Sequence, residues 1–223
     1  IAEARAVQEA LRGKVQTTDS LPSSIGTVAG IDAGFEEGGA ITRAAIAVLR
    51  FPDLKLVESA VARRPTTFPY VPGFLSFRET PAVLEAFAKL SAVPDVLFCD
   101  GQGIAHPRRF GIACHVGVLT GLPSLGVGKS RLYGRHEPVG SERGDTQPLH
   151  GHGETLGMVL RSKRGTNPLY LSPGHRMSVE TALQLALECL TRYRLPEPVR
   201  QAHALASLQK PSRTTPMLPL GGS

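Results

Sequence analysis

Two short apolar segments that each run into an aspartate constrain the fold of this chain more than any other feature. Residues 28–31 (VAGI) precede Asp32, and residues 96–99 (VLFC) precede Asp100. Runs of this length and composition predict buried strands. A carboxylate at the end of such a strand lies at the edge of the sheet, where open α/β folds place their functional sites. If the two strands are neighbours, the two acids face one another.

The order of the predicted elements defines an architecture. After an amphipathic helix, three strands with short turns indicate an antiparallel meander, and helices then alternate with single strands, which favours parallel pairing. The predicted strands of this part cover residues 27–32, 44–49, 54–61, 95–99 and 124–127, and the predicted helices cover residues 2–16, 81–90 and 108–119. We therefore expect a ribonuclease-H-like α/β fold, with a mixed central sheet of three antiparallel strands and then parallel strands, flanked by helices.

The rest of the chain is predicted to extend the same domain. Residues 133–153 are polar and rich in Gly, Pro and His, which predicts a long loop. The elements predicted after it are strands at 155–161 and 168–172, a helix at 178–193 capped by Ser178, and a short helix at 197–210. We expect a single domain over residues 1–210 and a disordered tail at 211–223, which is rich in Pro, Thr and Gly.

Charge and cysteine usage narrow the class of protein. The 25 Lys and Arg against 19 Asp and Glu give a net charge of +6, which favours an anionic partner such as nucleic acid. Three scattered cysteines in apolar runs, Cys99, Cys114 and Cys189, predict buried reduced thiols rather than disulfides or zinc ligands. No apolar run approaches the roughly 18 residues of a membrane span, and residues 1–14 do not resemble a signal peptide. We expect a cytoplasmic protein.

Asp32 and Asp100 are the first candidates for a catalytic metal site. Two close carboxylates repel each other unless a cation lies between them, and Mg²⁺ takes oxygen ligands while keeping several waters. Either aspartate alone is better explained as a turn or cap residue, so the metal interpretation depends on the pair. Glu79 is a third candidate, although the helix dipole commonly explains a glutamate in the first turn of a helix.

A glycine-rich segment follows Asp100 directly. Gly101, Gln102 and Gly103 form a flexible loop in which the backbone can approach a base or phosphate closely, and His106 follows. Arg108 and Arg109 are predicted to hold phosphates from the first turn of a helix. The alternative is an ordinary glycine turn with solvated arginines.

Residues 69–73 (PYVPG) are the other unusual segment. Pro69 and Pro72 stiffen the backbone around Tyr70 and Val71. A rigid, exposed tyrosine can wedge between bases or stack on one of them. The alternative is a tyrosine packed within a turn.

Lys129 lies in residues 126–132 (GVGKSRL), after a predicted strand, where a lysine suits a phosphate contact. A nucleotide-binding P-loop is excluded, because its first glycine would fall at Pro123. His203 lies on the last predicted helix, where a lone histidine is usually structural.

Taken together, these segments resemble the endonuclease V (deoxyinosine 3′-endonuclease) family in its bacterial form, over roughly residues 2–210. The matching strings are VAGIDAGF at 28–35, PYVPGFLSFRE at 69–79, DGQGIAHPRR at 100–109, GVGKSRL at 126–132, SPGH at 172–175 and RLPEPVRQAH at 194–203. The second and third strings are long and highly specific.

The resemblance implies a site and an activity. It implies that Asp32, Glu79 and Asp100 bind metal and that His203 is a further catalytic residue. It places Lys129 on the scissile phosphate. Residues 69–72 would be a wedge at the lesion, and residues 101–106 would help to form the pocket for the flipped hypoxanthine base.

The activity implied is Mg²⁺-dependent hydrolysis, with Mn²⁺ as a plausible substitute. The bond cut is the second phosphodiester 3′ to deoxyinosine, leaving 3′-hydroxyl and 5′-phosphate ends. The expected partner is DNA containing deoxyinosine, with inosine in single-stranded RNA as a second candidate, and we expect a monomer.

Two other interpretations of the residues stay open. Another ribonuclease-H-like nuclease, such as a junction resolvase, would explain the acids but not the PYVPGFLSFRE string. A nucleic-acid-binding protein without catalysis would explain the basic charge and the tyrosine. It gives no reason for acids at both strand ends, which would repel phosphate in the absence of metal.

Overall fold

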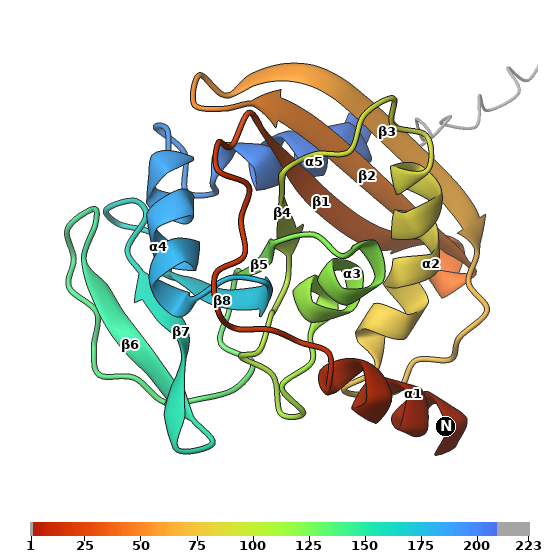
Figure 1. Cartoon of the computed structure of the whole chain (residues 1–223), viewed down its shortest axis with the longest axis horizontal. Helices are drawn as coiled ribbons and strands as arrows, with labels where there is room; N and C mark the ends of the chain where they lie inside the picture. The colour runs from red at the N-terminus through yellow and green to blue at the C-terminus, as the bar shows by residue number, and fades with distance from the viewer. Residues whose placement is uncertain (1, 209–223) are drawn as a thin grey trace, which may run out of the picture.

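A computed structural model describes residues 2–208, which form one eight-stranded mixed sheet with helices on its faces (Figure 1). The strand order is β3-β2-β1-β4-β5-β8-β7-β6. The strands are β1 (Thr27–Glu36), β2 (Ile41–Arg50), β3 (Lys55–Pro65), β4 (Val96–Asp100), β5 (Ser124–Gly128), β6 (Thr146–Gly151), β7 (Glu154–Leu160) and β8 (Leu169–His175). The helices are α1 (Ala2–Arg12), the short 3-10 helix η1 (Glu37–Gly39), α2 (Leu75–Phe87), α3 (Ile112–Thr120), α4 (Val179–Glu188) and α5 (Glu197–Leu208).

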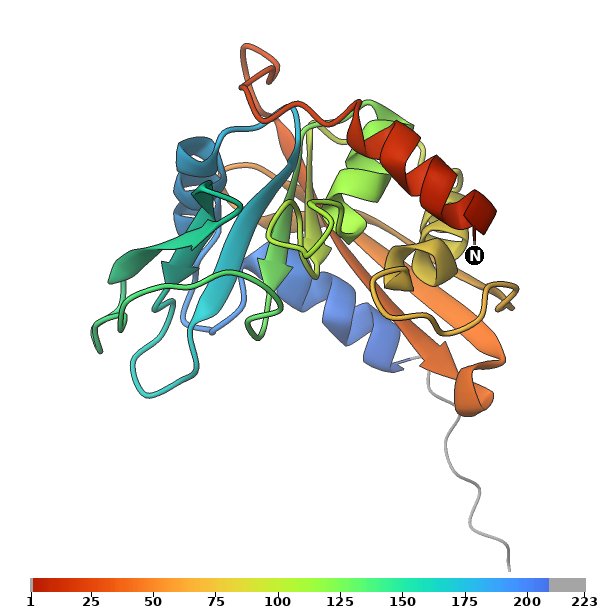
Figure 2. The same cartoon turned by 90° about the horizontal axis from the view of Figure 1, so that it is seen from below.

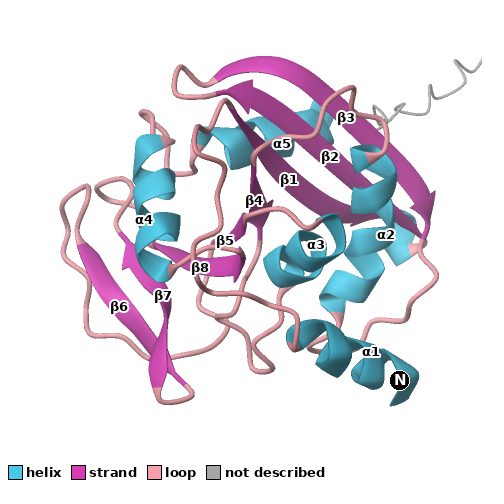
Figure 3. Ribbon diagram, in the orientation of Figure 1, coloured by secondary structure: helices cyan, strands magenta, loops and turns pink. Residues whose placement is uncertain are grey.

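The predicted sheet is confirmed in its essential pairings. Strands β1, β2 and β3 form the antiparallel meander, and β4 and β5 run parallel to β1 (Figure 3). Strands β8, β7 and β6 then extend the sheet with antiparallel pairs. The first and fourth strands are therefore neighbours, which is the condition for the two aspartates to meet.

Alternate residues of the central strands face different helices. Val28 packs in a cluster with residues of α4 and α5, whereas Ala29 and Ile31 pack with residues of α2 and α3. Figure 2 shows α5 beneath the sheet and α2 and α3 above it. Because both faces are covered here, residues 28–31 of β1 and 96–99 of β4 form continuous apolar runs, as expected for parallel strands with helices on both sides.

Two helices, α2 and α4, have a boundary that differs from the sequence prediction by five or more residues. Helix α2 begins at Leu75, six residues before the predicted start at 81, so Glu79 lies inside the helix rather than in its first turn. Pro81 lies within α2. Its ring cannot donate a backbone hydrogen bond, but the apolar residues that follow it, Ala82, Val83 and Ala86, are buried in the core and stabilise the helix. Helix α4 ends at Glu188, before the predicted end at 193, although Ser178 does cap it by accepting a hydrogen bond from the Thr181 amide at 3.1 Å.

The predicted long loop at 133–153 contains a strand. Residues 146–151 are β6, which forms a hairpin with β7 at the outer edge of the sheet. The two-residue turn of this hairpin is His152-Gly153, with φ of 53° and 79° at its two positions. Only one β6 side chain, that of Leu149, is buried. An edge strand of this kind lacks the apolar alternation from which a strand is predicted.

Other predictions concern chemistry and placement. All three cysteines are buried and free, which confirms the prediction of reduced thiols. Within residues 2–208, no helix is long and apolar enough to cross a membrane. The tail predicted at 211–223 lies outside the described residues, and the single-domain boundary at 210 stays a prediction.

Candidate active site

Asp32 and Asp100 lie side by side on neighbouring parallel strands. The register of β1 and β4 pairs Ile31 with Cys99, and the next residue on each strand is the aspartate. Asp100 is the last residue of β4, as predicted, whereas β1 continues past Asp32 to Glu36 because it pairs with β2 over its whole length. The prediction that Asp32 ends its strand is therefore wrong, but the two carboxylates still meet.

His203 reaches the same point from helix α5. Its Nδ1 lies 3.3 Å from Oδ2 of Asp32. Helix α5 can approach β1 this closely because position 30 is glycine. A Cβ at Gly30 would overlap the backbone carbonyl of Pro198, at the start of α5. The histidine that would usually be structural thus stands beside the first acid of the site.

Ligand atoms from Asp32, Asp100 and His203 all lie within 4.8 Å of one another. Within residues 2–208 these three form the group able to hold a metal ion, and Glu79 is outside it. Two carboxylate oxygens and an imidazole nitrogen suit a divalent cation such as Mg²⁺ or Mn²⁺. The donor set therefore fits the metal that the resemblance implies.

Glu79, on α2, lies near the two aspartates, and α2 packs on the opposite face of the sheet from α5. Burial, together with the negative charges of Asp100 and Asp32, raises the pKa of Glu79 to about 8. Burial also raises the pKa of Asp100, with Asp32 adding to the effect and Lys129 opposing it. This crowding of acids is unfavourable unless positive charge is present, and a divalent cation would supply it.

Lys129 supplies part of that charge. It follows β5, the parallel neighbour of β4, and its Nζ forms an ion pair with Oδ2 of Asp100. Arg194 donates a hydrogen bond to the Lys129 carbonyl at 2.8 Å, which fixes the backbone at this position. The structure therefore places this predicted phosphate-binding lysine directly beside the acids.

A cavity of about 460 Å³ opens beside the acids, between the PYVPG segment and the glycine-rich loop. Glu79 and Asp100 both line it. Of the predicted substrate-binding residues, those that line the cavity are Tyr70, Val71, Pro72, Gly101, Gln102, His106 and Arg108, whereas Pro69, Gly103 and Arg109 do not. Two strings that are distant in the sequence thus line one pocket.

The PYVPG segment presents Tyr70 outward and is held from behind. The Tyr70 side chain is 69% exposed. Arg108 donates to the Gly73 carbonyl at 3.1 Å and lies over the Phe74 ring at 4.3 Å from its centroid. Arg108 therefore holds the segment in place. The prediction that Arg108 lies in the first turn of a helix is wrong, because α3 begins only at Ile112.

His106 is buried in the wall of the cavity. Burial and the nearby Arg108 lower the pKa of His106 to about 4, so its imidazole is neutral at physiological pH. Its Nδ1 accepts a hydrogen bond from the Arg108 amide at 3.1 Å. The hydrogen of the neutral ring is therefore on Nε2, which can act as a donor.

Gly103 and Arg109 make structural contacts. The Gly103 amide donates to Ser172 Oγ at 2.8 Å, and a Cβ there would overlap the Pro173 carbonyl. Arg109 precedes α3 and forms an ion pair with Glu154 of β7. These contacts occupy the amide and the guanidinium that the sequence suggested for substrate.

Leu132 also lines the cavity and was not predicted as a site residue. Its side chain is 55% exposed at the edge of the cavity. The sequence gives no sign of this role, because the residues around Leu132 show no strand or helix periodicity.

Comparisons with known proteins agree with this geometry. The family model described as Endonuclease V matches residues 9–204. The endonuclease V of Nostoc punctiforme is 57% identical over 205 residues, covering 92% of this chain and 93% of that protein. The crystal structure of endonuclease V from Streptomyces avermitilis superposes with a TM-score of 0.87 at 41% identity, covering 93% of this chain and 91% of that chain.

A more distant structure holds a nucleic acid. Ciona intestinalis endonuclease V with a D234N substitution was crystallised with a 23mer DNA containing an inosine followed by a ribo-adenosine. It superposes with a TM-score of 0.79 at 26% identity, covering 93% of this chain and 95% of that chain. The family model and these relatives match nearly the whole length of the chain, which shows that this chain belongs to the endonuclease V family.

Proposed function

We propose that this chain incises DNA at deoxyinosine, by hydrolysing the second phosphodiester bond 3′ to the lesion and leaving 3′-hydroxyl and 5′-phosphate ends. The observation that carries the proposal is one juxtaposition: Asp32, Asp100 and His203 lie within 4.8 Å of one another, beside a cavity of about 460 Å³. A cavity of this size is large enough for a purine base. When a purine occupies this cavity, the backbone of its strand lies next to Asp100 and Glu79, which line the cavity.

The substrate follows from the family and from the cavity. A relative in this family was crystallised on DNA containing inosine, which supports the same lesion for this chain. The nucleotide after that inosine is a ribonucleotide, so cleavage beside inosine in single-stranded RNA is the second candidate activity. A mispaired inosine in duplex DNA costs less to extrude from the stack, and in single-stranded RNA there is no base pair to break.

Mg²⁺, with Mn²⁺ as a substitute, is the proposed cofactor, held by Asp32 and Asp100 with His203 and Glu79 beside them. When bound, such an ion acts as a Lewis acid that activates water and offsets charge on the phosphate. Glu79 offers a further carboxylate from α2. Lys129, paired with Asp100 in the free protein, is proposed to contact a non-bridging oxygen of the scissile phosphate.

The base is proposed to enter the cavity and meet its polar wall. The neutral His106 offers an Nε2 hydrogen, and hypoxanthine carries an acceptor at O6 where adenine carries an amino group. Gln102 lines the same wall, and its Oε1 is buried without a hydrogen-bond partner among the described residues. An unpaired buried acceptor of this kind is costly until a ligand donor satisfies it.

All these residues come from one chain, so a second copy is not needed to complete the site. We propose that the protein acts as a monomer and works in the cytoplasm, where bacterial DNA lies. Light scattering with and without an inosine duplex tests the first point, and a dimeric mass in both conditions would contradict it.

The deciding experiment is a cleavage assay on end-labelled duplexes that differ only at one base, inosine or adenine. The expected result is a nick at the second bond 3′ to inosine with Mg²⁺, and none with EDTA or on the adenine duplex. A ribonucleotide-substituted and a junction substrate complete the panel. Incision of the junction or of the adenine duplex at the same rate would overturn the proposal.

Replacing Tyr70 with alanine tests the wedge. Because the side chain is 69% exposed, its loss leaves the fold intact. We expect the inosine-over-adenine preference in binding to fall by about 5- to 150-fold, the range set by one base–aromatic stack. Tyr70→Phe is the matched control and should keep the preference, since the ring stacks without its hydroxyl. An unchanged preference in Tyr70→Ala would remove this residue from lesion recognition.

A further inference from the structure

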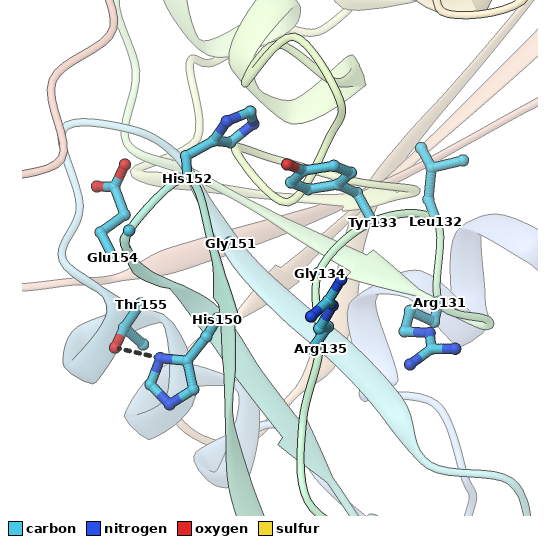
Figure 4. A pocket seen from close by; sticks show the side chains of 11 residues that line it. Arg131, Leu132, Tyr133, Gly134, Arg135, His150, Gly151, His152, Glu154 and Thr155 are labelled. Carbon is cyan, nitrogen blue, oxygen red and sulfur yellow. Dashed lines mark hydrogen bonds between the residues drawn. The ribbon is translucent and has the colours of Figure 1, made fainter.

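A second hollow lies next to the base cavity, between residues 131–135 and the β6–β7 hairpin (Figure 4). Its volume is about 1170 Å³, more than twice that of the cavity beside the acids. Leu132 lines both hollows, so they adjoin. The function proposed above for the acids and for the PYVPG segment does not use this groove.

One end of the groove is an aromatic platform. The rings of Tyr133 and His152 stack with centroids 4.7 Å apart and planes inclined by 25°. Tyr133 can lie close against β6 because position 151 is glycine, where a Cβ would lie 2.8 Å from Cε1 of the ring. His152 occupies the first position of the hairpin turn with a φ of 53°, a conformation that asparagine or glycine adopts more easily.

The groove is also positively charged. Arg131 and Arg135 line it, both are exposed, and neither guanidinium has a hydrogen-bond or ion-pair partner within residues 2–208. Glu154 is the acidic residue of the lining, and its carboxylate is already neutralised by Arg109. Two free guanidinium groups beside an aromatic platform match the two recurrent parts of a single-stranded nucleic-acid site, phosphate contacts and base stacking.

We propose that this groove binds the nucleotides flanking the lesion on the strand that is cut. Arg131 and Arg135 contact their phosphates, and an unpaired base stacks on the His152–Tyr133 platform. Charge complementarity and the shared Leu132 favour this occupant, because a strand whose base fills the cavity passes directly into the groove. The inference rests on the proposed function and adds the subsite that grips the substrate on one side of the lesion.

The first test is the double variant Arg131→Gln, Arg135→Gln. Binding is measured on single-stranded inosine oligonucleotides that extend only 5′ or only 3′ of the lesion. We expect affinity to fall for one of the two sets alone, and the slope of log affinity against log salt for that set to decrease by about 1.4, as for two lost phosphate contacts. Arg50→Gln, Lys55→Gln is the matched control, since it removes two exposed charges near the end of the sheet opposite the acids.

The second test is His152→Asn, which removes the stacking ring but suits a turn position with positive φ. Its thermal stability should equal or exceed that of the wild type, while affinity for the same oligonucleotide set falls by about fivefold or more. Equal losses for both sets, or no loss in either variant, would overturn the subsite. Absence of inosine incision by the wild type would instead refute the proposed function, so the two failures are distinguishable.

Discussion

Replacing Asp100 with asparagine is expected to lower the rate of inosine incision by at least about 10³-fold, or roughly 4 kcal/mol of transition-state stabilisation. Asparagine keeps the size of the side chain but removes the charge that, with Asp32, would hold a divalent ion. The fold should not suffer. Burial and Asp32 raise the pKa of Asp100, so its charged form is unfavourable in the folded protein, and a neutral replacement relieves that repulsion.

Three measurements separate chemistry from folding in this variant. Single-turnover cleavage with Mg²⁺ should be lost, binding of the inosine duplex should survive with Ca²⁺ or without metal, and the Tm in EDTA should be no lower than in the wild type. The rise in Tm that Mg²⁺ gives the wild type should shrink, because linkage requires a bound ligand. Asp53→Asn is the control, the same change in an exposed hairpin. Cleavage near the wild-type rate would exclude Asp100 from the mechanism.

Asp32 and Asp100 could be predicted as site residues because the pattern that identifies them lies in the residues directly before them. Apolar runs before Asp32 and Asp100 indicate strands, and parallel pairing of those strands brings the two residues together. Pro69 to Pro72 could be singled out for the same reason, since proline and an exposed aromatic act through their immediate backbone. Sequence patterns of this kind also predicted the antiparallel meander and the parallel strands after it, which the sheet confirms.

The contacts that complete the site are not local, and the sequence could not supply them. His203 is an ordinary helical histidine until α5 is packed on β1, 171 residues away from its partner Asp32. The ion pair between Arg109 and Glu154 likewise forms only because the fold brings β7 beside the segment that precedes α3. Strand β6 and the start of α2 were missed because tertiary packing, rather than periodicity, stabilises them.

Gly30→Ala is the prediction that tests this long-range placement of His203. The added Cβ would overlap the Pro198 carbonyl, which is backbone and cannot move without shifting α5. We expect a cost of about 3 kcal/mol, the upper end for overpacking. For a chain of this size, that cost lowers Tm by roughly 6–12 °C. Because α5 carries His203 to Asp32, incision should also fall by at least about tenfold at temperatures where the variant remains folded.

The control for this variant lies on the same strand. At Gly34 a Cβ would lie 3.2 Å from a terminal nitrogen of Arg43, a flexible side chain, so Gly34→Ala should leave Tm and incision close to wild type. His203→Ala separates the two effects of Gly30→Ala, because it should lower incision without the fall in Tm. If Gly30→Ala has the Tm and the incision rate of the wild type, α5 does not depend on that glycine for its approach to β1. The geometry that brings His203 to Asp32 would then need another cause.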